Sequence, residues 1–109
     1  MLQLRPVWAR RGQHLYRVMV EGSGTMVPVL NTGDFIRGFF STRVVAASSP
    51  DQATRLAFDA VMAEWRPLGQ RANGSESAQP TLTVSELTQL RSRVCLRAPR
   101  GFSFFTQLG

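Results

Sequence analysis

The chain has 109 residues, of which 43% are hydrophobic and 18% charged, with a formal net charge of +6. This length and composition predict one globular domain with a modest core, and they exclude a disordered chain. The apolar runs extend over only a few residues, which excludes a membrane-spanning helix, and the absence of lysine excludes a P-loop and a Schiff-base enzyme.

The N-terminal segment contains no continuous apolar run, because Gln3, Arg5 and Pro6 interrupt it, so we expect no secretory signal. Cys95 is the only cysteine and His14 the only histidine. One chain therefore forms neither an intramolecular disulfide nor a Cys/His zinc site. We expect a cytoplasmic protein without a cofactor or a metal ion.

The first strand is predicted to begin at His14. Its side chains alternate between a clearly apolar face and a mixed face, the first holding Tyr16, Val18 and Val20 and the second Leu15, Arg17 and Met19. The composition of EGSGT, residues 21–25, predicts a turn. The short apolar run 26–30 contains Pro28, which favours an edge strand or a loop. A second turn is expected at 31–34.

Residues 35–47 predict a longer strand that bends at Gly38. Apolar side chains occur on both of its faces, one with Phe40, Thr42, Val44 and Ala46 and the other with Phe39, Ser41, Arg43, Val45 and Ala47. A sheet face of such mixed character often meets a second subunit.

A helix over 50–66 is predicted to follow directly. Ser49 suits the N-cap, Pro50 the first helical position, and Gln52 completes a capping box, so this junction needs no ligand to explain it. The expected buried stripe consists of Ala53, Leu56, Ala57, Ala60, Val61 and Trp65, with Phe58 and Met62 on its flank. We expect the helix to end before Pro67, because a proline disfavours helical conformation in the residue before it.

The C-terminal part begins with a small, polar segment, 67–80, which predicts a mobile linker. A strand resumes at 81–84 with Leu82 and Val84 inward, and the alternation then slips, which predicts a bulge or one helical turn between Ser85 and Gln89. Alternation returns over 91–98. After a turn at 99–101, Phe102 and Phe104 alternate in a last strand.

Together these elements predict an α+β domain in two layers. We expect a mainly antiparallel sheet of four to five strands with one long helix, at about 50–66, packed on one face in a ferredoxin-like or related arrangement. The single domain spans 1–109, with 1–12 as a loosely attached lead-in that Trp8 could anchor. If the strands flanking the helix are parallel neighbours, their connection should be right-handed.

An arginine series in the late strand is the strongest chemical pattern. Alternate residues of a strand lie about 6–7 Å apart, close to the spacing of phosphates along a nucleic-acid strand. The candidate nucleic-acid contacts are Arg91, Arg93, Arg97 and Arg100. A solvated strand face in an arginine-rich protein explains the same series, and the basic-aromatic signature of RNA-binding domains is absent.

The remaining motifs have structural explanations. GSG at 22–24 lacks the third glycine and the helix of a dinucleotide-binding loop. Cys95 can act as a nucleophile with His14 as its base only if the fold brings them together, and a lone cysteine in a strand is typically an inert small residue. The seven carboxylates show no metal or acid/base spacing. We therefore expect no catalytic, cofactor-binding or metal site and no enzyme activity.

Several segments resemble a group of small uncharacterised bacterial α+β proteins with YRVxxEG, GFxTTRxVxA and GFxFY patterns. They are YRVMVEG, GFFSTRVVAASSPDQATRLAFDAVMAEW, TLTVSEL and PRGFSFF, with departures at Ser41 and Phe105. The resemblance implies a ferredoxin-like or related fold and assigns no functional residue. A weaker similarity to HicB-type antitoxins, without their cysteine before the helix, implies an antitoxin-like or immunity-type inhibitor.

The function expected from these observations is association with other proteins, without catalysis. We expect a homodimer formed through the sheet face opposite the helix, with Leu15, Met19, Phe39 and Val45 as candidate surface residues. The alternative is a nucleic-acid-binding module that uses the arginine series, and a minor alternative is the inhibitor. The net positive charge also permits an acidic protein partner, and no membrane partner is expected.

Overall fold

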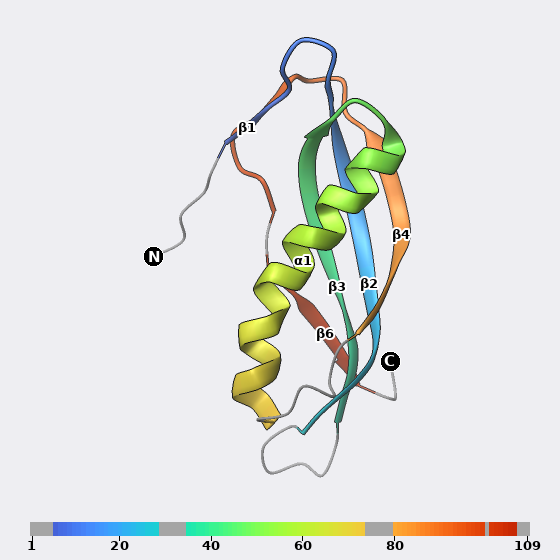
Figure 1. The fold of residues 1–109 in the computed structure, drawn as a ribbon, viewed down its shortest axis with the longest axis vertical. Helices are drawn as coiled ribbons and strands as arrows, with labels where there is room; N and C mark the ends of the chain where they lie inside the picture. Colours follow the sequence, from blue (N-terminus) through green and yellow to red (C-terminus); the bar gives the residue numbers. More distant parts are fainter. Residues whose placement is uncertain (1–5, 29–34, 74–79, 100, 107–109) are drawn as a thin grey trace.

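A computed structural model describes residues 6–28, 35–73, 80–99 and 101–106. The elements follow in the order β1 (Val7–Trp8), β2 (His14–Pro28), β3 (Phe35–Ala47), α1 (Pro50–Asn73), β4 (Thr81–Gln89), β5 (Val94–Cys95) and β6 (Ser103–Thr106). A four-stranded antiparallel sheet has the order β4-β2-β3-β6, and β1 pairs with β5 in a separate two-stranded ribbon. The helix lies along one face of the larger sheet (Figure 1). The predicted α+β architecture is confirmed, whereas the ferredoxin-like arrangement stays a prediction.

The prediction of a turn at Glu21–Thr25 is wrong, because this segment lies within β2. Its register with β3 pairs Gly22 with Phe39 and shifts between Ser23 and Val27. Glycine and serine here accommodate a close neighbour and an irregularity in the ladder. Pro28 pairs with Phe35 of β3. The pairing of β2 with β4 ends at Ser23, so the missing N–H of Pro28 does not interrupt the hydrogen bonds between β2 and β4.

The connection from β3 through α1 to β4 is a crossover between parallel strands. Both strands run antiparallel to β2, which lies between them, so they are parallel but not neighbours. With α1 in front, as in Figure 1, the chain passes from β3 to β4 on its right. This is the right-handed sense that strand twist favours for such connections.

The start of α1 follows the predicted cap closely. The Gln52 amide N–H donates to Ser49 Oγ over 3.1 Å, and the Ala53 amide donates the first helical bond to the Ser49 carbonyl over 3.0 Å. The Gln52 side chain accepts from the amide of Ser48 at 2.7 Å rather than from that of Ser49. The capping box therefore closes one residue earlier than the standard motif.

The core lies between α1 and the β2–β3 hairpin. Buried helix residues recur every four positions, at Ala53, Ala57, Val61 and Trp65, over a sheet face that holds Tyr16, Val18, Val20, Phe39 and Ala47. The rings of Phe39 and Trp65 stack with centroids 5.0 Å apart, and Phe102 meets both rings edge-on. This aromatic cluster ties the last part of the chain to the helix and the hairpin.

Three expectations about α1 and the following segment are corrected. Leu56 is 39% exposed, so the buried stripe is narrower than its apolar spacing predicts. The helix continues through Pro67 to Asn73, so residues 67–73 are helical rather than a linker. Pro67 is exposed, and because it has no N–H it cannot donate a helical hydrogen bond. The rest of the expected linker, 74–79, lies outside the described residues.

The slip in alternation after Val84 is a β-bulge, the first of the two predicted alternatives. β4 pairs Glu86 with Met19 and Val84 with Val20, so Ser85 is the extra residue. The bulge lets Leu82 and Leu87, which are an odd number of residues apart, both pack against the core. Leu82, Val84 and Leu87 therefore share the face of β4 on the helix side of the sheet.

The expected loose lead-in is attached to the body of the protein from Val7 onward, while residues 1–5 lie outside the described residues. β1 pairs with β5, and the Ala9 amide donates to the Arg93 carbonyl over 2.8 Å. Trp8 is 59% exposed, so it does not anchor this segment in the core. The attachment is made by backbone pairing and by the side chain of Arg93, and not by the indole.

Candidate functional site: the outer face of the sheet

The face of the larger sheet opposite α1 is called the outer face here. The register places on it alternate residues of β2, β3 and β4, which are Leu15, Arg17, Met19, Glu21, Phe40, Thr42, Val44, Ala46, Thr83, Glu86 and Thr88. Leu15 and Val44 are buried, toward the end of the sheet where β1 contacts β3. Beyond them, Met19 and Thr42 are half-buried and Phe40 is 36% exposed. The outer face is thus closed at one end and open at the other.

The residues predicted for a dimer surface divide between the two faces. Phe39 is fully buried and packs with Trp65 on the helix side, and Val45 also packs against the core. Leu15 lies on the outer face but is fully buried. Met19 alone of the four lies on the open part of the outer face. The alternation in β3 grouped its residues correctly but did not indicate which group meets the helix.

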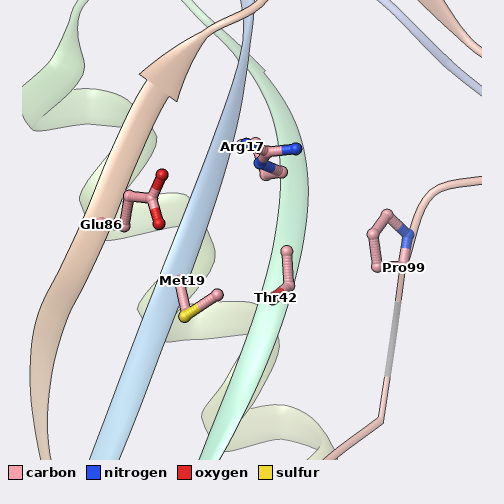
Figure 2. A pocket seen from close by; sticks show the side chains of 5 residues that line it. All are labelled: Arg17, Met19, Thr42, Glu86 and Pro99. Carbon is pink, nitrogen blue, oxygen red and sulfur yellow. The ribbon is translucent and has the colours of Figure 1, made fainter.

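Two adjoining cavities of about 480 and 300 Å³ lie over the open part of the outer face. Both are lined by Met19, Thr42 and Pro99, which faces the sheet from the segment between β5 and β6. Figure 2 shows Pro99 across a gap from Thr42, with Arg17 and Glu86 over different strands and Met19 below both of them. The first cavity reaches these two charges, and the second reaches Phe40. We call this combined hollow the trough.

The charged groups in the described lining of the trough are one arginine and one glutamate. Arg17 and Glu86 are exposed, and neither forms an ion pair with another described residue. Among its described lining residues, Glu86 is the only carboxylate, and neither Cys95 nor His14 contributes. The structure does not bring the suggested nucleophile and base into the trough. Its surface combines an apolar floor with one charge of each sign.

A buried polar cluster on the helix side is a feature that sequence reasoning missed. Arg43 is 8% exposed, and its Nη1 lies 2.5 Å from Glu64 Oε2. Its Nε donates to Ser41 Oγ over 3.0 Å, and that hydroxyl donates to the Gly101 carbonyl over 2.6 Å. The cluster joins β3, α1 and the segment before β6. The sequence contained a signal for this cluster. Arg43 is among the inward residues of β3, and Glu64 lies beside the buried stripe of the helix.

The arginine series does not form the predicted stripe. The strand contains only Val94 and Cys95, so Arg91, Arg93 and Arg97 do not alternate along one face. The guanidinium of Arg93 donates to the carbonyls of Gln13, Ala9 and Arg10 over 3.3, 3.1 and 2.6 Å. Arg93 therefore supports the turn before β2. Arg91 and Arg97 are exposed, and Arg100 lies outside the described residues.

Comparisons with protein-family models, with curated proteins and with solved structures give no match. Within the described ranges, no three His, Cys, Asp or Glu side chains are grouped so that they could hold a metal ion. Among the described residues, no helical segment is both long enough and apolar enough to cross a membrane. The interpretation of the trough therefore depends on its own geometry and charges.

Proposed function

We propose that this protein acts in the cytoplasm by association and without catalysis, as a homodimer formed through the open part of the outer face. The observation that carries the proposal is the trough, an apolar floor of Met19 and Phe40 next to two charges of opposite sign that form no ion pair within the described part of the chain. The unpaired state of Cys95 agrees with a reducing compartment.

The charges favour a second copy of the same chain as the partner. Symmetric dimers bury the same patch on both subunits, so the patch must complement itself. A two-fold axis in the plane of the interface, passing between Arg17 and Glu86, places each arginine opposite the glutamate of the second copy. The two unpaired charges of one chain then become two intermolecular ion pairs around an apolar centre.

The test is sedimentation of the purified chain over a range of concentrations. We expect a reversible dimer, which Glu86→Arg weakens because each Arg17 then faces a like charge. The charge-swapped double variant, Arg17→Glu with Glu86→Arg, should restore the dimer, because an isologous interface keeps both pairs. Phe40→Ser should also weaken it, whereas Val84→Ser, at a similarly exposed position on the other face of the sheet, should not.

Two results would contradict the proposal. A wild-type chain that remains monomeric at high micromolar concentration excludes the homodimer and favours the inhibitor alternative, in which a different protein occupies the outer face. A dimer that responds to Val84→Ser but not to Phe40→Ser places the interface elsewhere. Circular dichroism of each variant separates lost association from lost folding.

A further inference from the structure

The charges of this protein are unevenly distributed. Residues 6–13 and 90–99, which form the β1–β5 ribbon and its flanks, contain five arginines and no carboxylate. The other described residues contain six arginines and five carboxylates. Almost all the excess positive charge of the described chain therefore lies on this one part, which we call the basic lobe. Figure 1 shows the ribbon at one end of the molecule, to the side of the larger sheet.

Four of the five arginines of the basic lobe are available to a partner. Arg93 supports the turn before β2 through three backbone carbonyls. The side chains of the other four are exposed, and none of them pairs with a carboxylate in the described part of the chain; they are Arg10, Arg11, Arg91 and Arg97. An array of guanidinium groups without counter-charges attracts an anionic partner.

An exposed apolar surface lies among these arginines. Trp8 and Val94 are cross-strand partners on the ribbon, 59% and 40% exposed, and Leu96 is 68% exposed. The other cross-strand pair, Val7 with Cys95, is half-buried. The ribbon thus turns one face toward the body of the protein and presents the indole of Trp8 to solvent. An exposed tryptophan in a cationic surface offers a flat ring next to positive charge.

We infer that the basic lobe is a binding site for single-stranded nucleic acid. Its arginines match the phosphates, and the indole of Trp8 matches a base, which can stack on an aromatic ring once it is free of a duplex. An acidic protein would satisfy the arginines but not the indole, and in a duplex the faces of the bases are already stacked. This site is separate from the trough, and it does not depend on the predicted arginine stripe.

The experiment measures fluorescence anisotropy of labelled single-stranded oligonucleotides, dT and rU tracts of about 16 nucleotides, the upper end of the site sizes seen for single-strand binders. Binding should weaken with salt, with a slope of log K against log salt of about −0.7 per phosphate neutralised. Arg91→Ala with Arg97→Ala should reduce that slope. The matched control is Arg55→Ala with Arg66→Ala, which removes two exposed arginines of α1 and should leave the slope unchanged.

The indole gives a second, independent readout. Trp8→Ala should weaken binding about tenfold while Trp8→Phe, which keeps a ring, should lose less. Quenching of tryptophan fluorescence by the oligonucleotide should disappear in Trp8→Phe, because Trp65 is buried in the core. Phe40→Ser should bind as the wild type does, which separates this site from the proposed dimer face.

Several outcomes would overturn the inference. They are an absence of binding at low salt, equal affinity for duplex and single strand, and equal loss of affinity in the two arginine double variants. Binding to vesicles of phosphatidylglycerol and phosphatidylcholine without binding to either oligonucleotide would identify an anionic lipid surface as the partner instead.

Discussion

The aromatic ring of Phe39 lies directly against the α-carbon of Gly22, its cross-strand partner in the β2–β3 hairpin. A Cβ built on Gly22 would lie 2.5 and 2.8 Å from the two Cε atoms of Phe39, and closer still to Cζ. Glycine therefore makes room in mid-strand for the ring that stacks on Trp65. The same glycine gave the sequence its turn-like composition.

Gly22→Ala should destabilise the protein by about 1–3 kcal/mol, the usual range for overpacking a filled core. Ser23→Ala, the next residue and exposed, should change stability by less than about 0.5 kcal/mol. Chemical denaturation measures both. Adding Phe39→Leu to Gly22→Ala should cost less than the sum of the two single changes, because the smaller side chain leaves space for the methyl group. If the stability losses of the two single changes simply added up in the double variant, the ring of Phe39 would not be what restricts the side chain at residue 22.

Ser49→Ala removes the hydroxyl that accepts the Gln52 amide and should cost about 1 kcal/mol. For a domain of this size that loss lowers the midpoint of thermal unfolding by about 4 °C. Ser48→Ala is the matched control, because it removes only an exposed hydroxyl bond to Gln52 Oε1, and the Ser48 backbone amide still donates to the same oxygen. Equal effects of the two changes would mean that the cap does not act through the Ser49 hydroxyl.

Glu64→Gln removes the charge that faces the buried guanidinium of Arg43 and should cost about 1–3 kcal/mol. The glutamate side chain is 28% exposed, and solvent keeps the loss below that of a fully buried pair. Replacing both partners, with Arg43→Met and Glu64→Leu, should recover much of the loss, because no buried charge is left unpaired. Urea titrations give the free energy of unfolding of the Glu64→Gln variant and of the double variant. A double variant less stable than Glu64→Gln would show that the ion pair itself stabilises the fold.

Arg93→Ala removes three hydrogen bonds to the carbonyls around the turn before β2. We expect faster hydrogen exchange at the amides of Ala9 and Gln13, which bond to Arg93 and Arg10 carbonyls in this turn, with little change in the core of β2. Arg91→Ala, which removes an exposed arginine nearby, should leave both amides protected. Unchanged exchange in Arg93→Ala would show that the turn holds without its guanidinium.

The candidate site was only partly predictable from the sequence. The mixed character of β3 indicated that one face of the sheet would be left for a partner, and Met19 lies on that face. The trough itself also needs Pro99, which is remote from Met19 in sequence and is placed there by the path between β5 and β6. The exposed pair of Trp8 and Val94 likewise depends on a pairing between two distant short strands, each of only two residues. No local pattern encodes such contacts.

The sequence by itself determined the local features: the bounds of β3, the cap at Ser49, the alternation of β2 and the slip in alternation in β4. Each depends on backbone preference or on hydrogen bonds between residues close along the chain. Only the tertiary structure decided which face of β3 meets α1, because both faces carry apolar side chains and only packing distinguishes them. Phe39 fits against Gly22 and Trp65, so its face became the core, and Phe40 was left on the face open to a partner.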